Sequence, residues 1–289
     1  MSSRTDLLSS DFLSKLSRLS YLLKKKASLQ EGLHLGSDSG GHFEFEDYRL
    51  YHPGEDLRHL DWNVYARTEK FYLKRFSRER DQFIAVFLDL SNRMDFGHPN
   101  KLDRALQITA GLAYLTLHQK SKIKIFAGAK KDSKIYHSPR HLPMVLKYLM
   151  GLQAAPNSGI RNNVRRILAQ RPQSMVVISD FLEPFLFQEF QYLLGKRSSF
   201  GLIQILAPEE ENPPWRGWWN LKSVETSEIR EFRFNPEILQ RYKHLLGQYR
   251  ESLRTFSLKH SLFFQSHSSA LPLESWLENL HLEGNLFVR

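Results

Sequence analysis

The chain contains four short runs of apolar residues that predict strands buried on both faces. One run extends from Phe83 to Leu88, and the others cover 122–127, 174–179 and 200–206. Apolar runs of this length with β-branched residues are typical of central strands in parallel sheets. Helical patterns separate the runs, so the order of elements predicts βαβ units with right-handed crossovers. The expected fold class is therefore α/β, with a mostly parallel sheet flanked by helices.

Weaker patterns predict the remaining elements. Alternating residues indicate two strands at 43–46 and 71–76 and a hairpin at 221–234. We also expect an edge strand at 134–137 and a last strand at 261–265. Apolar residues three and four positions apart predict helices at 10–27, 102–116, 141–150, 161–170, 184–194, 236–258 and 273–280.

These elements suggest two domains. Residues 1–80 would form an N-terminal helix and a small β-containing extension, and residues 81–289 would form the α/β domain. A hairpin inserted around 208–235 interrupts the second domain, where Trp215, Trp218 and Trp219 cluster. We expect these tryptophans to pack beneath the hairpin, because large aromatic side chains bury well.

Composition narrows the possible functions. The 289 residues carry a formal net charge of +10, which favours acidic partners such as nucleic acid or an acidic protein surface. The chain has no cysteine, no glycine-rich phosphate loop and no histidine pair with metal-ligand spacing beside a carboxylate. We therefore expect a protein that is not an enzyme. No apolar run is long enough to span a membrane and no signal-peptide core is present, so we expect a cytoplasmic protein.

Two of the predicted core strands end in an aspartate. Asp89 follows the first run, with Ser91 and Asn92 close behind it, and Asp180 follows the third. The carboxyl ends of parallel strands form the edge at which α/β sheets bind ligands. Carboxylate and hydroxyl oxygens are also the ligands that Mg²⁺ prefers. A metal site at this edge is thus one prediction to test.

A second group of polar residues precedes the first core strand. It alternates arginines and carboxylates with aromatic residues, which usually indicates a paired structural network, although a partner-binding role stays open. Pro53 and Gly54 fit a type II turn within this block. The residues that make up the group are Arg49, Pro53, Gly54, Asp56, Arg58, Asp61, Trp62 and Arg67.

Two motifs resemble known families. The segment from Asp89 to Met94 is similar to a damaged D-x-S-x-S metal-ion-dependent adhesion motif of von Willebrand factor A domains, which have a Rossmann-like sheet. Ser179-Asp180 and the segment 207–210 are similar to later features of a second family. That family is domain-of-unknown-function family 58, and its signature resembles Tyr48-Arg49, Pro53-Gly54-Glu55-Asp56, Arg58, Asp61-Trp62, Ala66-Arg67 and Lys74.

The resemblance implies a von Willebrand factor A-like fold and a class of partner. Family members are often encoded beside MoxR-type AAA+ ATPases and are thought to act as adaptors in complex assembly or cofactor insertion, so the ATPase and a client protein are the expected partners. In the family, Asp89, Ser91 and Asp180 would be metal ligands. Here Arg93 replaces the second serine and Ile160 the expected threonine. Because arginine offers only donors, we expect a degenerate site in which Arg93 pairs with Asp89 or Asp180. Arg93, Asn92 and Ile160 are then the candidate partner-binding or charge-replacing residues.

Two alternatives remain open at this stage. The first is a divalent-cation-dependent binding domain, in which Mg²⁺ or Mn²⁺ is held with help from Asn92 or Asp95. The second is a basic nucleic-acid-binding protein, although no recognisable nucleic-acid module accompanies the charge. The basic residues behind that alternative are Lys24–Lys26, Lys120, Lys122, Lys124, Lys130, Lys131 and the arginines from Arg161 to Arg171.

Overall fold

The structure is a computed structural model that describes most of the chain. The described residues are 11–12, 14–18, 43–51, 60–78, 83–128, 132–156, 158–160, 163, 166–167, 169–170, 172–182, 199–224, 228–273 and 275–276. Contacts divide the chain into a smaller unit, Gln30–Gln82, and a larger unit, Met1–Leu29 with Phe83–Arg289. The sequence groups the first helix with the extension, whereas Phe12 and Leu16 pack in the core of the larger unit.

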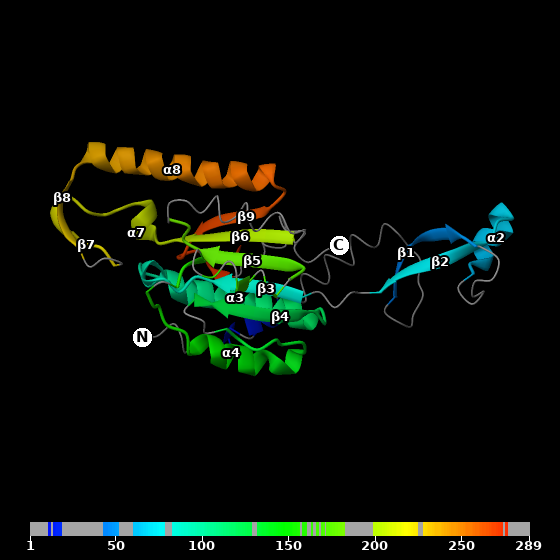
Figure 1. The fold of residues 1–289 in the computed structure, drawn as a ribbon. Coiled ribbons are helices and arrows are strands. Elements are labelled where there is room, and N and C mark those ends of the chain that lie inside the picture. The colour runs from blue at the N-terminus through cyan, green and yellow to red at the C-terminus, as the bar shows by residue number, and fades with distance from the viewer. Residues whose placement is uncertain are drawn as a thin grey trace. The chain divides into compact units, whose positions relative to one another are not determined.

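The described part of the smaller unit contains an antiparallel pair of strands and one short helix (Figure 1). Strand β1 (Phe43–Leu50) pairs with β2 (Tyr72–Arg78), and the register shifts at a bulge between Phe45 and Asp47. Both strands are confirmed, and both are longer than the alternation predicts. Helix α2 (Trp62–Thr68) was not predicted. It begins where Asp61 caps it, with Oδ1 accepting the N–H groups of Asn63 (2.9 Å) and Val64 (3.3 Å).

The larger unit is built on a five-stranded sheet in which all neighbours are parallel. The strand order is β4-β3-β5-β6-β9 (Figure 1). The strands are β3 (Phe83–Leu88), β4 (Lys122–Ala127), β5 (Ser174–Ser179), β6 (Ser199–Leu206) and β9 (Phe263–Ser268). The four apolar runs therefore form the four neighbouring strands of the sheet, and the predicted α/β class is confirmed.

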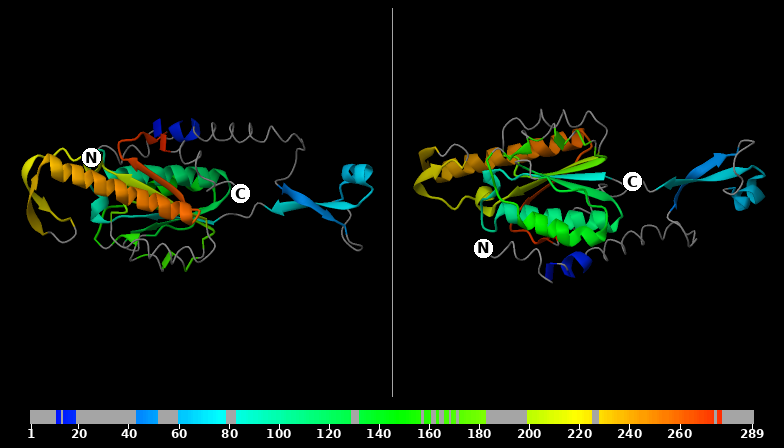
Figure 2. Two further views of the ribbon diagram at one scale, coloured as in Figure 1. Left: turned by 90° about the horizontal axis from the view of Figure 1, so that it is seen from above. Right: turned by 60° about the horizontal axis from the view of Figure 1, so that its bottom comes forward.

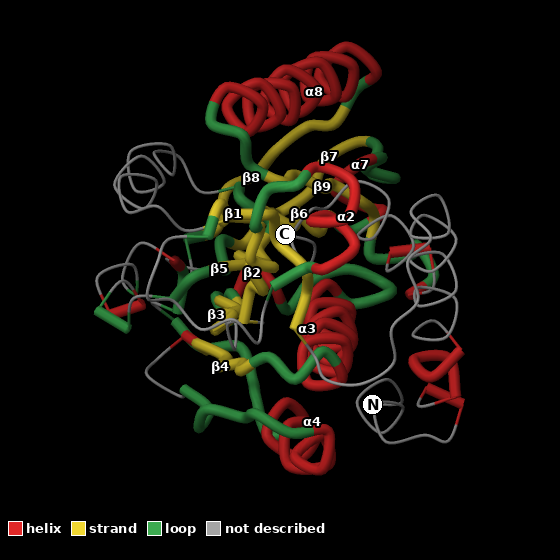
Figure 3. The backbone as a smooth tube through the Cα atoms, turned by 90° about the vertical axis from the view of Figure 1, so that its right-hand side faces the viewer, coloured by secondary structure: helices red, strands yellow, loops and turns green. Residues whose placement is uncertain are grey.

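Side chains of β3 alternate between two cores, because successive residues of a strand point to opposite faces. Ile84 and Val86 join a core that contains α3 (Lys101–His118) and α4 (Leu142–Met150). Ala85 and Phe87 join a second core on the other face. Figure 3 shows α3 beside the sheet, α4 near β4, and α8 (Pro236–Lys259) near β9. Both faces of β3 are thus covered, which explains its unbroken apolar sequence.

A hairpin extends beyond the end of the sheet (Figure 2). It consists of β7 (Gly217–Lys222) and β8 (Ile229–Phe234), between the short helix α7 (Pro208–Glu211) and α8. The hairpin was predicted, but it begins four residues earlier than 221. The expected packing of its tryptophans is wrong for two of them, since Trp218 is 64% exposed and Trp219 is 45% exposed.

Other predictions are confirmed only in part or lie outside the described residues. The expected edge strand at 134–137 is reduced to one antiparallel bridge between Ile123 and Tyr136. Short 3-10 turns occur at Asn92–Met94 and Pro139–His141. The helix predicted at 184–194 lies outside the described residues, as do parts of those at 10–27, 161–170 and 273–280. None of the helices in the described ranges combines the length and apolar character needed to cross a bilayer.

Candidate functional site

Asp89 lies at the carboxyl edge of the sheet, directly after β3. Its N–H donates to the carbonyl oxygen of Ile178 (3.0 Å), which extends the pairing with β5 by one residue. Its side chain is buried and accepts two hydrogen bonds, from the Ser91 N–H to Oδ1 (2.8 Å) and from the Ser179 hydroxyl to Oδ2 (2.6 Å). The two sequence-predicted residues Asp89 and Ser91 are therefore together, as the motif requires.

Asp180 lies at the same edge, directly after β5, and its side chain is fully buried. Oδ1 accepts the N–H of Leu182 (3.1 Å), and the Asp180 carbonyl oxygen accepts the Gln204 side-chain amide (2.9 Å). Arg93 approaches the same carboxylate, with Nε 3.8 Å from Oδ1. Arg93 therefore lies beside Asp180, one of the two aspartates with which we expected it to pair, although 3.8 Å is a long separation for an ion pair.

The closest cation to Asp180 is a residue that the sequence analysis did not identify. Lys101 is the first residue of α3, and its buried ammonium lies 2.9 Å from Asp180 Oδ2 and 2.6 Å from Glu210 Oε1. A lysine in the first helical turn is disfavoured by about 0.3–1 kcal/mol through the helix dipole. Removing one partner of a buried ion pair costs about 3–5 kcal/mol, so the two carboxylates decide where this lysine lies.

Glu210 reaches the cluster from α7, which follows β6. Its second oxygen, Oε2, accepts the N–H of Ala207 (2.8 Å), so one carboxylate both binds Lys101 and closes the first turn of α7. The Glu210 carbonyl oxygen accepts the hydroxyl of Tyr242 on α8 (2.8 Å). We call Asp89, Arg93, Lys101, Asp180 and Glu210 the carboxyl-edge cluster. It connects the ends of β3, β5 and β6 to the start of α3.

Burial changes the acidity of the carboxylates in the cluster. Burial raises the pKa of Asp89 above its usual value, and the nearby charge of Asp180 raises it further, against the hydrogen bonds from Ser179 and Ser91. Burial also raises the pKa of Glu210, and the Lys101 charge opposes that shift. Lys101 therefore opposes the rise in the pKa of Glu210 that burial causes.

Two further residues were predicted as partner-binding or charge-replacing. Asn92 is partly exposed, and its amide donates to the carbonyl oxygen of Val224 in the loop between β7 and β8 (3.3 Å). Ile160 is 1% exposed and belongs to the second core, so its side chain is not available to a partner. The prediction that Ile160 binds a partner or replaces a charge is therefore wrong, because this residue is part of the core.

A divalent cation does not fit the cluster as it stands. Asp180, which the resemblance makes a metal ligand, directs one oxygen to the Lys101 ammonium and the other toward Arg93. An ion bound there would face two positive groups within one small buried site. Groups of three or more carboxylate or histidine ligands with metal-binding spacing are also absent from the described ranges. The geometry favours a built-in ammonium as the positive charge.

The residues of the upstream signature lie in the smaller unit. Asp61 caps α2 through backbone N–H groups, and Trp62 (64% exposed) and Arg67 lie on the exposed surface of that helix. The structure does not describe the side chain of Arg49. Four more, Pro53, Gly54, Asp56 and Arg58, lie outside the described residues. For Asp61, the two hydrogen bonds support a structural role as a helix cap.

One feature of the sequence could have identified Lys101 as a residue of the site. Lys101, Ala105, Ile108 and Leu112 share the spacing of the buried stripe of α3, so the lysine stands at the end of an otherwise apolar face. Asn100 caps the helix by accepting the N–H groups of residues 102 (2.8 Å) and 103 (3.3 Å), which marks Lys101 as its first residue. A charged residue on a buried stripe needs a partner, and only the fold identifies that partner.

The fold and the cluster define an α/β protein with a charge-paired site at the carboxyl edge of a parallel sheet. The model of the family described as "Protein of unknown function DUF58" matches residues 47–252, and the chain belongs to this family. Among similar proteins are uncharacterized proteins of Mycobacterium bovis and Mycobacterium tuberculosis, each 26% identical over 226 residues, which is 74% of this chain and 71% of theirs. The match to the family model confirms the resemblance to family 58 drawn from the sequence.

Two solved structures were also found to be similar at 14% identity. One is the conserved hypothetical protein BatB from Bacteroides thetaiotaomicron, with a TM-score of 0.41 over 70% of this chain and 96% of that one. The other is an aerotolerance-related membrane protein from Bacteroides fragilis, with a TM-score of 0.42 over 70% and 98%. Because these scores are low, our description of the fold rests on the strand order given above.

Replacing Lys101 by methionine would leave Asp180 and Glu210 buried without their shared cation. We expect Lys101→Met to lower the free energy of unfolding by about 3–5 kcal/mol at pH 7, measured by urea denaturation. Lys147 on α4 is exposed, so Lys147→Met should change stability by less than about 0.5 kcal/mol. Adding Asp180→Asn to Lys101→Met should restore part of the loss. Equal effects of the two lysine variants would contradict the role given to Lys101.

The raised pKa of Asp89 predicts a dependence of stability on pH. The folded protein holds this proton at pH values where the unfolded chain, with a pKa near 3.8, has released it. The contribution of Asp89 to stability therefore falls as pH rises from about 4 through the raised pKa. Asp89→Asn cannot titrate, so its stability relative to the original protein should be higher at pH 7 than at pH 4 in urea titrations. A difference that is constant with pH would reject this expectation.

Cation binding tests the fit of the site. By calorimetry, the unaltered protein should show no micromolar binding of Mg²⁺ or Mn²⁺. The double variant Arg93→Ser with Lys101→Ala removes both positive groups facing Asp180, so Mn²⁺ should raise its unfolding midpoint more than that of the unaltered protein. Micromolar binding by the unaltered protein would support the divalent-cation-dependent alternative instead.

Proposed function

We propose that this chain is a non-enzymatic, cytoplasmic adaptor that binds a MoxR-type AAA+ ATPase and a client protein during complex assembly or maturation. The observation that carries the proposal is the buried ammonium of Lys101 between Asp180 and Glu210. This ion pairing occupies the edge of the sheet where an α/β protein would otherwise bind a ligand. The site then has a structural task, which is to hold the loops around it in place.

The burial of the aspartates supports a role without catalysis. A general acid or base must come within hydrogen-bonding distance of its substrate. Asp89 and Asp180 are buried, and the protein's own groups already bind their oxygens. The carboxyl-edge cluster therefore supplies rigidity to the surface above it, and binding rather than reaction is the activity we assign to that surface.

The hairpin β7–β8 is the surface we assign to the ATPase. Trp218 and Ile229 are each 64% exposed and lie on the same face of the hairpin, because Trp218 pairs with Arg233 and Ile229 with Lys222. Exposed apolar groups gathered on one element often mark a protein interface. The hydrogen bond from Asn92 to Val224 links the hairpin loop to the cluster. Basic residues on the same face, and the net charge of +10, suit an acidic patch on the partner.

A binding measurement tests the proposal directly. The purified chain should bind the MoxR-type ATPase encoded in the same genome, measured by biolayer interferometry with and without ATP. The double variant Trp218→Ser with Ile229→Ser should weaken binding at least about tenfold, because central aromatic side chains usually contribute most to an interface. Leu245→Ser is the matched control, since Leu245 is 53% exposed but lies on α8.

The outcomes separate the parts of the proposal. Failure of the unaltered chain to bind the ATPase under either condition would reject the adaptor function. Binding that is unchanged by the hairpin variant would reject the hairpin as the contact while leaving the partnership in place. Turnover of any substrate that depends on Asp89 or Asp180 would overturn the non-enzymatic assignment.

A further inference from the structure

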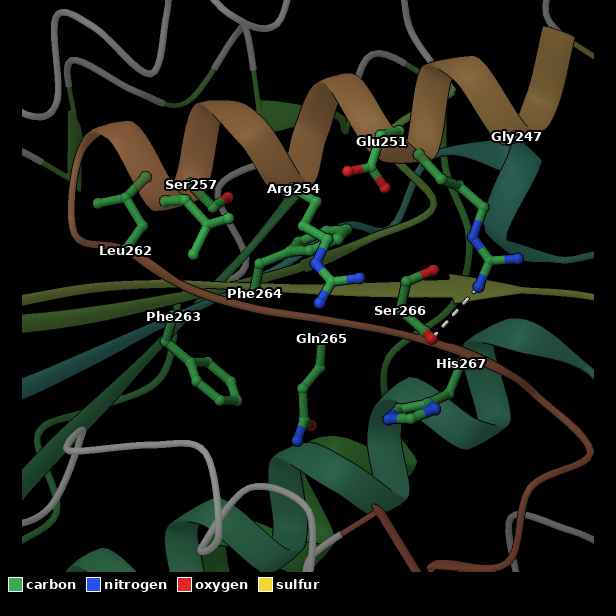
Figure 4. Close-up of a pocket in the computed structure, with 12 residues that line it drawn as sticks. Gly247, Glu251, Arg254, Ser257, Leu262, Phe263, Phe264, Gln265, Ser266 and His267 are labelled. Carbon is green, nitrogen blue, oxygen red and sulfur yellow. Dashed lines mark hydrogen bonds between the residues drawn. The ribbon is translucent and has the colours of Figure 1, made fainter.

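A groove of about 650 Å³ lies between α8 and β9, away from the ends of β3 and β5 (Figure 4). Helix α8 contributes Arg250, Arg254 and Leu258 to its wall among others, and residues 263–267 of β9 form the opposite side. In Figure 4, Arg254 points from α8 toward the strand, while Gln265 and His267 point from β9 to the opposite side. The groove therefore follows the outer edge of the sheet and reaches both faces of β9.

The hydrogen bonds show which backbone groups of β9 face this groove. The N–H of Ser269 donates to the carbonyl oxygen of Leu206 on β6 (2.7 Å), so residue 269 faces β6. The carbonyl oxygen of Ser266 instead accepts from the Arg250 guanidinium on α8 (3.4 Å). Because backbone groups alternate in direction along a strand, Phe264 and Ser266 direct their N–H groups away from β6. The hydrogen bonds of Ser269 and Ser266 therefore agree on which residues of β9 direct their backbone groups away from β6.

In the described part of the chain, no strand pairs with β9 on that side. β9 is the last strand in the order β4-β3-β5-β6-β9. An edge strand presents unpaired N–H and C=O groups in a row, and an extended peptide can add to it as a further strand. With six residues, β9 is long enough to pair with a short peptide segment. The backbone therefore offers a binding mode that does not depend on the peptide's sequence.

The side chains of the groove select for negative charge. Arg250 is held by Glu211 (3.1 Å), whereas none of the described residues forms an ion pair with Arg254, which is exposed. Among the described residues that line the groove, Glu251 is the one acidic residue. Because Glu211 already pairs with Arg250, Arg254 is the arginine that can accept a new carboxylate, and carboxylates on alternate residues of an added strand would lie next to α8.

A buried amide gives a second indication that the groove accepts a ligand. Gln265 is 2% exposed, and neither its oxygen nor its nitrogen has a hydrogen-bond partner in the described ranges. A buried polar group without a partner costs about 1–3 kcal/mol. Gln265 lines the groove on the side opposite α8, where the remaining side chains of an added strand would lie. A bound peptide could supply the missing partner.

We propose that the groove between α8 and β9 binds an extended acidic peptide, which adds as a further strand to the edge of β9 that no described strand pairs with, and which pairs its carboxylates with Arg254. The peptide would belong to a protein partner. This site is independent of the proposed function, because it uses neither the hairpin nor the carboxyl-edge cluster.

The absence of cysteine from the chain makes a specific fluorescent reporter possible. Leu258→Cys places a single thiol at an exposed position that lines the groove, and Leu245→Cys places one on the same helix outside it. Both variants are labelled with an environment-sensitive dye. The probe is a panel of ten-residue peptides that alternate glutamate with valine, isoleucine or tyrosine. We expect at least one peptide to change the fluorescence at position 258 and to leave position 245 unchanged.

Two controls test the binding mode and the charge. The same peptides with lysine in place of glutamate, or with N-methyl groups on alternate residues, should bind at least about tenfold more weakly, since the first reverses the charge and the second blocks strand pairing. Arg254→Glu should weaken binding at least about tenfold. Arg241→Glu is the matched control, since Arg241 is exposed on α8 outside the groove.

Several results would overturn the proposal. One is failure of every acidic peptide to bind. Another is equal binding of the N-methylated peptides, and a third is equal loss of affinity in the two arginine variants. Sedimentation of the unlabelled protein adds a further test, because a dimer that the acidic peptides do not dissociate would assign the edge of β9 to a second copy of the chain.

Discussion

The carboxyl edge of this sheet depends on the ion pairs that the Lys101 ammonium forms with two carboxylates. It pairs with Asp180 at the end of β5 and with Glu210 on α7, and its loss would leave the buried Asp180 and the partly buried Glu210 without their shared cation. Desolvation of Lys101, Asp180 and Glu210 is costly, so the pairing by itself is weak evidence of high stability. The ion pairing instead fixes the relative positions of three elements, because one cation connects α3, β5 and the segment that leads into the hairpin.

The positive charge at this edge is supplied by the protein itself. Asp89, Ser91 and Asp180 lie at the carboxyl edge of the sheet, while the positive charge comes from Lys101, with Arg93 nearby. The Lys101 ammonium is covalently attached, so unlike a bound metal ion it cannot dissociate from the site. The hydrogen bond from the Asn92 side chain to the Val224 carbonyl oxygen connects the loop after β3 to the hairpin loop.

The hairpin and the edge of β9 are two surfaces of different character. The hairpin presents side chains, with aromatic and basic groups exposed on a two-stranded element. The edge of β9 presents backbone groups beside two arginines. Side-chain contacts favour one shaped partner, whereas strand addition accepts many peptides of suitable charge.

The sequence by itself determined the α/β class, the four core strands and the places of Asp89 and Asp180, because unbroken apolar runs and helical periodicity are local patterns. It also showed that Arg93 departs from the metal motif. Only the tertiary structure decided that Lys101 is the nearest cation, that Ile160 is core, and that Trp218 is exposed. The reason is that pairing and burial depend on residues far apart in the chain: 79 positions separate Lys101 from Asp180 and 109 separate it from Glu210.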